Sequence, residues 1–202
     1  MSFNLEKSYI ENLKKYVGKD LNIIESENRI EVIQDSEIQY ILEKNSKNNY
    51  IFYCMERGRK FILGEYLLEI EMRRKFAIAI NGFLGEKINY NNGDEFQEGK
   101  DIVEIEKLMN LYVGKEYYSI KNPKKMKMNL EEEEEKGKYS IYLLGLNGEK
   151  VYKEKKLDAP FVFFRFYSEA LFFKISIERI NKYEKIFNDI LGSKEKYNLI
   201  IS

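Results

Sequence analysis

The tetrapeptide YVGK occurs twice in the chain, at residues 16–19 and again at residues 112–115. The surrounding segments KYVGKDLNII (15–24) and LYVGKEYYSI (111–120) are identical at five of ten positions, at an offset of 96. Apolar residues before each copy keep the spacing of one helical face. The pattern therefore predicts an amphipathic helix that ends at Gly18 or Gly114 in a left-handed C-cap. Phosphate binds at the N-terminus of a helix, whereas this glycine and lysine follow the C-terminus of one. We therefore interpret YVGK as a helix end and not as a phosphate-binding site.

A second pair of segments matches further along the chain. INGFLG (80–85) resembles FNDILG (187–192), now at an offset of 107. The apolar spacing around the later copy is helical, so we interpret both as helix ends and predict helices over residues 65–84 and 168–191. The longer offset places insertions in the second half.

Strand patterns lie between the helices in each half. Residues 29–34 and 125–130 largely alternate polar with apolar side chains, and apolar runs follow at 50–55 and 138–144. Turn signals close these runs at Arg57-Gly58-Arg59 and at Asn147-Gly148.

The sequence thus predicts an α+β fold, a tandem duplication of a helix–antiparallel meander–helix unit. The first repeat covers residues 1–88, and the second covers 98–202 with an acidic-loop insertion. Residues 86–100 form the predicted linker, and the repeats either stay separate or pack as one unit. Chance similarity in a chain rich in Lys, Ile and Tyr is the alternative to duplication.

Composition limits the chemistry available. The 202 residues include 34 basic and 34 acidic side chains, no histidine and one cysteine, Cys54. Without histidine there is no conventional acid–base pivot near neutral pH, and the common zinc ligand sets are missing. Neither glycine-rich phosphate-binding motif occurs. We therefore expect no catalytic residues, metal or cofactor, and a buried, unreactive Cys54.

Charged segments are the most unusual local features. Five consecutive glutamates, in the segment that the first repeat lacks, are either a solvated loop or a contact for a basic protein. The arginines beside Gly58 keep the turn soluble or contact a partner. The candidate partner-binding residues are Glu131, Glu132, Glu133, Glu134, Glu135, Arg57 and Arg59.

Two apolar segments suggest further elements. The aromatic run FVFFRFY (161–167) has one basic residue, Arg165, so a central strand covered on both faces is favoured over a base-stacking surface. Residues 197–201, YNLII, predict an exposed edge strand through which the chain could form oligomers.

The N-terminal residues do not have the basic start and apolar stretch of a signal peptide. No apolar run in the sequence is long enough to cross a bilayer. We therefore expect a cytoplasmic protein without membrane partners. Balanced charge makes nucleic acid an unexpected partner.

In class and composition, the whole chain resembles the immunity proteins of bacterial polymorphic-toxin systems, although it carries no diagnostic motif. The resemblance implies a non-catalytic protein that neutralises a cognate toxin domain by direct binding, with a basic domain as one candidate partner. The alternative is a nucleic-acid-associated protein or a hydrolase that uses only Arg, Lys and carboxylates. A homo-oligomeric structural protein is a third hypothesis.

Overall fold

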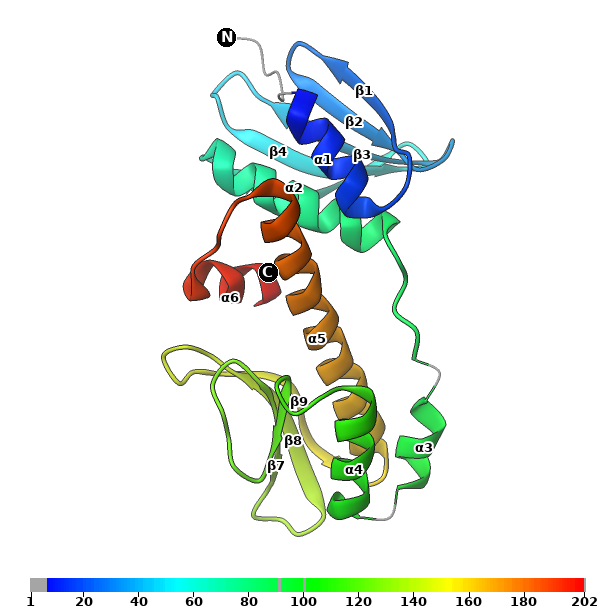
Figure 1. Cartoon of the computed structure of the whole chain (residues 1–202), viewed down its shortest axis with the longest axis vertical. Coiled ribbons are helices and arrows are strands. Elements are labelled where there is room, and N and C mark those ends of the chain that lie inside the picture. The colour runs from blue at the N-terminus through cyan, green and yellow to red at the C-terminus, as the bar shows by residue number, and fades with distance from the viewer. Residues whose placement is uncertain (1–6, 91, 100, 202) are drawn as a thin grey trace. The chain divides into compact units, whose positions relative to one another are not determined.

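The computed structural model describes residues 7–90, 92–99 and 101–201, and it divides into two compact units (Figure 1). The first unit takes the chain up to Lys87 and also residues 179–190. The second takes residues 88–178 and the segment from Leu191 onward. One long helix, α5 (Phe161–Phe187), therefore contributes residues to both units. The predicted division at residues 88–98 did not include a helix shared in this way.

The first unit contains a five-stranded antiparallel sheet whose strands lie in chain order, β1-β2-β3-β4-β5. Its elements are α1 (Lys7–Val17), β1 (Asn22–Ser26), β2 (Arg29–Ile33), β3 (Ile38–Lys44), β4 (Tyr50–Glu56), β5 (Arg59–Tyr66) and α2 (Glu69–Leu84). The strands expected at 29–34 and 50–55 are confirmed. The helix expected over 65–84 is also confirmed, but it starts later because its first residues belong to β5.

Aromatic contacts hold α2 against one face of this sheet. Phe76 packs edge-to-face on Phe52 with ring centroids 5.2 Å apart, and Phe83 stacks on Tyr40 at 4.7 Å. Phe76 and Phe52 are buried, so the core of the first unit lies between α2 and the sheet.

The first YVGK copy ends α1 and anchors it. Gly18 has φ +84°, and its N–H donates to the Lys14 carbonyl at 2.9 Å, which confirms the predicted left-handed cap. Tyr16 is fully buried, and its hydroxyl donates to the Arg179 carbonyl at 2.9 Å. Asn81 donates from Nδ2 to the Tyr16 carbonyl at 2.8 Å. This stretch thus joins α1 to α2 and to the last turns of α5.

The second unit contains a four-stranded sheet in the order β6-β7-β8-β9. Its elements are α3 (Gly93–Glu98), α4 (Ile102–Tyr112), β6 (Tyr118–Ile120), β7 (Met128–Glu132), β8 (Lys138–Leu144), β9 (Lys150–Asp158), the first part of α5, and α6 (Ser193–Ile201). Asp101 caps α4 by accepting from the backbone N–H groups of Val103 and Glu104, both at 2.9 Å. Gly114 ends α4 with φ +105°, so the second predicted cap is confirmed too.

The prediction of an antiparallel meander is wrong for one pair in the second unit. β6 pairs with β7 in parallel, whereas β7, β8 and β9 are antiparallel. The chain between β6 and β7 includes two non-glycine residues with positive φ, Lys121 and Met126. This connection returns the chain so that β7 runs in the direction of β6.

The aromatic run at residues 161–167 is helical, so the predicted central strand is wrong. It forms the first two turns of α5, and the expected helix over 168–191 runs instead from Phe161 to Phe187. The buried positions Val162, Phe163, Phe166 and Tyr167 have helical spacing. A continuous apolar run does not separate a buried strand from a buried helix by periodicity alone.

The predicted edge strand at residues 197–201 is also wrong, because these residues form the end of α6. Just before the helix, the backbone N–H of Gly192 donates to the Glu195 carboxylate at 2.8 Å. A side chain that reaches back in this way resembles half of a capping box. Helix initiation at Ser193 therefore prevails over the β-propensity of the Tyr, Leu and Ile residues that follow.

The predicted linker, residues 86–100, contains α3. Phe96 of α3 is fully buried and stacks on Tyr167 of α5, with ring centroids 4.2 Å apart. A Cβ at Gly93 would come within 2.7 Å of the Phe164 ring, so this position requires glycine unless the ring moves. The later part of the segment thus belongs to the core of the second unit.

None of the described helices is both long enough and apolar enough to cross a membrane.

Candidate functional site

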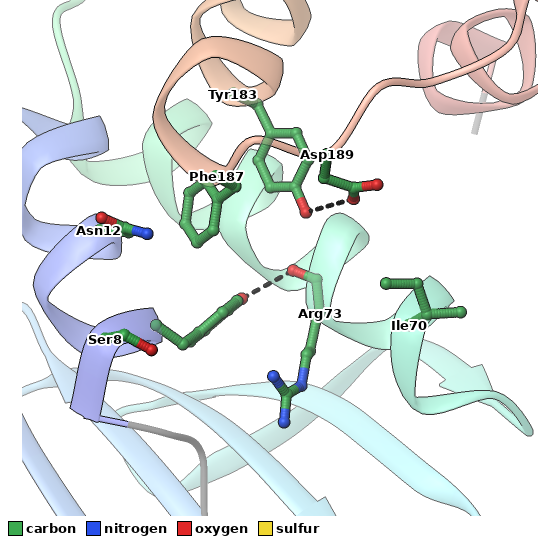
Figure 2. A pocket seen from close by; sticks show the side chains of 8 residues that line it. Ser8, Asn12, Ile70, Arg73, Tyr183, Phe187 and Asp189 are labelled. Carbon is green, nitrogen blue, oxygen red and sulfur yellow. Dashed lines mark hydrogen bonds between the residues drawn. The ribbon is translucent and has the colours of Figure 1, made fainter.

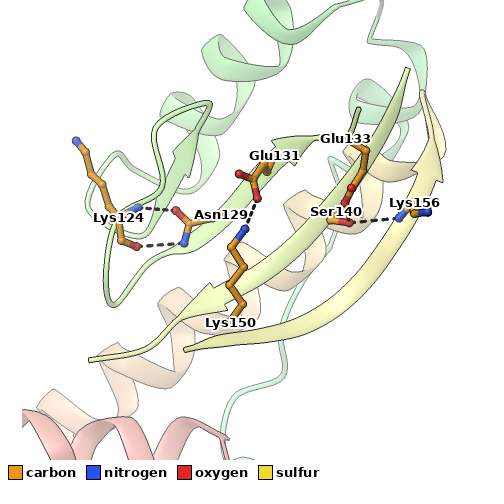
Figure 3. Close-up of polar contacts among 7 residues, drawn as sticks. All are labelled: Lys124, Asn129, Glu131, Glu133, Ser140, Lys150 and Lys156. Atoms are coloured by element: carbon orange, nitrogen blue, oxygen red, sulfur yellow. Dashed lines mark hydrogen bonds and ion pairs between the residues drawn. The ribbon is translucent and has the colours of Figure 1, made fainter. Parts of the chain in front are cut away.

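The five glutamates lie in the β7–β8 hairpin of the second unit. Figure 3 shows Glu131 and Glu133 in this hairpin. Glu131 and Glu132 belong to β7 and pair with Ser140 and Tyr139 of β8. The prediction of an acidic loop is therefore wrong for these two residues, and only residues 133–135 lie in the connection. The pairing with β8 therefore extends the strand by two residues into the run of glutamates.

Two of the five carboxylates are held by neighbouring side chains. Lys150 of β9 donates from Nζ to Glu131 at 2.5 Å, and this hydrogen bond lowers the pKa of Glu131. The Ser140 hydroxyl donates to Glu133, and the same hydroxyl accepts from the Lys156 backbone N–H at 3.3 Å (Figure 3). These carboxylates tie the three antiparallel strands together, so they are less available to a partner.

Glu132, Glu134 and Glu135 are exposed at the end of the hairpin. Two hydrogen bonds hold the backbone of the connection that carries them, from the Glu133 N–H to the Lys138 carbonyl at 2.8 Å and from the Lys138 N–H to the Glu135 carbonyl at 3.0 Å. We call these three glutamates the acidic tip. A fixed backbone presents the three charges with little conformational entropy to lose on binding.

A buried asparagine supports the other end of β7. Asn129 accepts from the Lys124 N–H at 2.7 Å and donates from Nδ2 to the Lys124 carbonyl at 3.1 Å (Figure 3). Nδ2 also donates to the Lys127 carbonyl at 2.7 Å. Its side chain thus satisfies three backbone groups of the connection between β6 and β7. The role is structural, and its only signal in the sequence is a polar residue between two apolar ones, Met128 and Leu130.

The two candidate arginines lie in the first unit, at the turn between β4 and β5. Arg57 has φ +48° and Gly58 has φ +76°, the conformation of a two-residue type I′ turn, so the predicted turn is confirmed. Arg57 donates from Nε to Glu37 at 3.0 Å, and Arg59 is exposed. They belong to a different unit from the glutamates.

A pocket of about 260 Å³ in the first unit was not predicted (Figure 2). It lies where α1, α2 and the end of α5 meet. Its lining residues are Ser8, Tyr9, Asn12, Ile70, Arg73, Tyr183, Phe187 and Asp189.

Most charged and hydroxyl groups around this pocket already have partners within the fold. Tyr9 donates its hydroxyl proton to the Arg73 carbonyl at 2.7 Å, and Tyr183 donates to Asp189 at 3.0 Å (Figure 2). Arg74 holds Asp189 with two hydrogen bonds of 2.7 Å and 2.6 Å. These bonds lower the pKa of Asp189, and burial raises the pKa values of Tyr9 and Tyr183. Asp189 stays ionised and Tyr183 stays protonated at neutral pH, which suits a structural network better than proton transfer.

Other reactive chemistry has little support in the described residues. They contain no group of three or more Cys, Asp or Glu side chains placed to hold a metal ion. Cys54 is half-buried, where a fully buried thiol was expected. Burial raises the pKa of its thiol, and the charge of Glu56 raises it further, so the reactive thiolate is disfavoured.

Comparisons with known proteins give no match: no protein-family model, no curated protein and no solved structure is similar to this chain.

Proposed function

We propose that this chain is a non-catalytic binding protein that acts in the cytoplasm and neutralises a cognate bacterial toxin domain by direct contact. The observation that carries the proposal is the acidic tip, three exposed carboxylates on a hairpin whose backbone and neighbouring carboxylates are fixed by internal bonds. The three negative charges outnumber the one exposed positive charge beside them, Lys136. A preorganised excess of negative charge favours a partner with a basic surface and accelerates its association.

The chemistry of the partner follows from this geometry. A toxin domain that cleaves nucleic acid needs a basic groove for phosphates. Glu132, Glu134 and Glu135 would enter that groove in place of the phosphates and block access of the substrate. The paired carboxylates of Glu131 and Glu133 would support the hairpin and contribute little direct contact.

The direct test is co-expression with any candidate toxin domain found in a neighbouring reading frame, followed by measurement of cell survival and of co-purification. The triple variant Glu132→Lys/Glu134→Lys/Glu135→Lys should lose binding by about 100-fold or more, because three attractive contacts become repulsive. The matched control is Glu25→Lys/Glu27→Lys, which reverses two exposed carboxylates in the β1–β2 hairpin of the first unit. Full protection by the triple variant would exclude the acidic tip as the contact.

A different outcome would favour the alternative function. If no protein partner is retained and the chain binds nucleic acid with a steep salt dependence, the neutralising role is wrong. Electrophoretic mobility shifts at several salt concentrations make this measurement.

We also infer that the two units are divergent copies of one helix–sheet–helix unit. Each unit has a helix that ends at YVGK in a left-handed glycine, and each later has a hairpin with a five-residue connection, at residues 45–49 and 145–149. The parallel β6–β7 pair and the four strands of the second sheet are departures from the common plan. Related chains whose halves are more alike would strengthen this inference. Relatives in which only one half carries the capped helix would overturn it.

A further inference from the structure

β5 is an edge strand with an unusually apolar surface. It lies last in the five-stranded sheet, so one side of its backbone has no partner among the described strands. Three consecutive apolar side chains on it are exposed, Phe61 by 48%, Ile62 by 60% and Leu63 by 40%. Long apolar edges are generally avoided in monomers, because they pair with other strands.

Charges of opposite sign flank this apolar segment. Arg59 and Lys60 come before it, and Glu65 comes after it; all three are exposed. An antiparallel partner strand that is basic, then apolar, then acidic would place each charge opposite its complement. β5 itself has this order.

A β-bulge places the charges on the correct faces. The register with β4 shifts at Leu63, because Tyr53 is opposite Ile62 whereas Phe52 is opposite Gly64. Lys60 is opposite Met55 and Glu65 is opposite Ile51, and residues 51, 53 and 55 of β4 share one face. Lys60, Ile62 and Glu65 therefore share that face. Without the extra residue, positions 60 and 65 would lie on opposite faces.

We propose that β5 pairs with β5 of a second copy of this chain, antiparallel and around a two-fold axis. In the register that pairs the charges, Lys60 lies opposite Glu65 of the second copy, and Ile62 lies opposite its Leu63, the extra residue of the bulge. Phe61 and Gly64, which share the other face, also lie opposite one another. The two-fold axis repeats each contact, so the dimer contains two Lys60–Glu65 pairs and a continuous sheet of ten strands.

The other edge of the same sheet does not have this complementarity. β1 reads Asn22-Ile23-Ile24-Glu25-Ser26 and carries a carboxylate but no basic residue. Antiparallel pairing of two β1 strands would gain no opposite-charge contact. Self-association is therefore assigned to β5, and β1 serves as the control edge for the variants below.

The first experiment measures mass by sedimentation equilibrium from about 1 to 200 μM protein. The wild-type chain should show a reversible dimer of twice its 24.2 kDa mass. Ile62→Lys places two ammonium groups near the axis and should raise the dimer dissociation constant by about 100-fold or more. Ile24→Lys is the matched control, since Ile24 is 49% exposed on β1, and it should leave the dissociation constant unchanged.

A charge exchange tests the register. Lys60→Glu or Glu65→Lys alone creates two like-charge contacts and should raise the dissociation constant about tenfold. Lys60→Glu/Glu65→Lys restores both pairs with reversed polarity and should recover most of the wild-type affinity. A circular dichroism spectrum and a urea transition for each variant show that the fold is retained.

Three results would overturn the proposal: a monomer at every concentration, a dimer insensitive to Ile62→Lys, or a charge exchange that fails to restore association. A monomer whose β5 variants instead lose binding to a toxin domain would assign this edge to that partner. Toxin neutralisation is scored separately with the acidic-tip variants, so either proposal can fail without the other.

Discussion

In the two copies of YVGK the glycines have the same structural role, whereas the tyrosines have different roles. Gly18 and Gly114 both end a helix with positive φ. Tyr16, however, is fully buried and bonds a carbonyl of α5, whereas Tyr112 is half-buried and donates to the Glu95 carboxylate at 2.7 Å. Local sequence therefore determines the helix end, while the packing of each unit determines what the neighbouring aromatic ring contributes.

The two units also use ion pairs in different surroundings. Arg74 and Asp189 of the first unit have side chains only 17% and 20% exposed. Lys150 and Glu131 of the second have side chains 35% and 39% exposed. Solvent screens the second pair more strongly, so the same kind of contact should be worth less there.

Truncating the tyrosines should give the largest difference between the two copies. We expect Tyr16→Ala to lower the free energy of unfolding by about 3–5 kcal/mol, because it empties a fully buried site between three helices. Tyr112→Ala should cost about 1–2 kcal/mol, since that ring is half-buried. Urea denaturation of both variants measures this difference, and equal losses would show that the copies have equivalent roles.

Neutralising the acid of the more buried pair should have the next largest effect. Asp189→Asn removes a charged hydrogen-bond acceptor from Arg74, and we expect a loss of about 2 kcal/mol at pH 7. The folded-state pKa of Asp189 is lowered, mainly by the hydrogen bonds from Arg74. Its stabilisation is therefore complete above the unfolded-state pKa, near 3.8, and is lost as the pH falls through the folded-state value.

The pH dependence gives this prediction a control. Urea transitions between pH 2 and 7 should show a weaker loss of stability on acidification for Asp189→Asn than for the wild type. Parallel curves for the two proteins would mean that the Arg74–Asp189 contact does not persist in solution.

Replacing the cap glycines should have a smaller effect that is similar in the two units. Gly18→Ala and Gly114→Ala each force a side chain into the left-handed region, at about 1–2 kcal/mol. Gly18 has open space around its position, whereas a Cβ at Gly114 would come within 2.9 Å of the Glu116 carboxylate. Thermal unfolding should therefore show an equal or slightly larger loss for Gly114→Ala. A neutral result at either position would contradict the cap assignment.

The smallest effect is expected at the more exposed pair. Glu131→Gln keeps the shape of the side chain and removes its charge beside Lys150, at a cost of less than about 1 kcal/mol. The loss should shrink further in 1 M salt, where exposed charges are screened. A loss as large as that of Asp189→Asn would show that the two ion pairs are equally protected from solvent.

The elements that were predicted correctly are those with local signals. Gly18, Gly114 and the Arg57-Gly58 turn require positive φ, and each was readable from a few adjacent residues. The errors arose where one pattern fits two structures. The apolar run at 161–167 suits a buried strand as well as a helix. The apolar residues of YNLII likewise favour a strand, although the Gly192–Glu195 interaction before them starts a helix.

The candidate sites divide in the same way. The glutamate run was visible in the sequence, but its division into held and exposed carboxylates depends on Lys150 and Ser140 of neighbouring strands. The pocket in the first unit depends on contacts between residues as far apart as Arg74 and Asp189, separated by 115 positions. No local pattern encodes such a contact. The bulge that aligns Lys60 with Glu65 likewise follows from the strand register.

Because α5 is shared between the units, the first unit cannot complete its folding until most of the chain has been translated. The first unit needs residues 179–190, including Tyr183, whose ring contacts Tyr16. Roughly 100 residues must be translated after Lys87 before that segment exists, which takes about 5–20 s at about 5–20 residues per second. During this interval the nascent first unit lacks the rings of Tyr183 and Phe187 that pack against Tyr16.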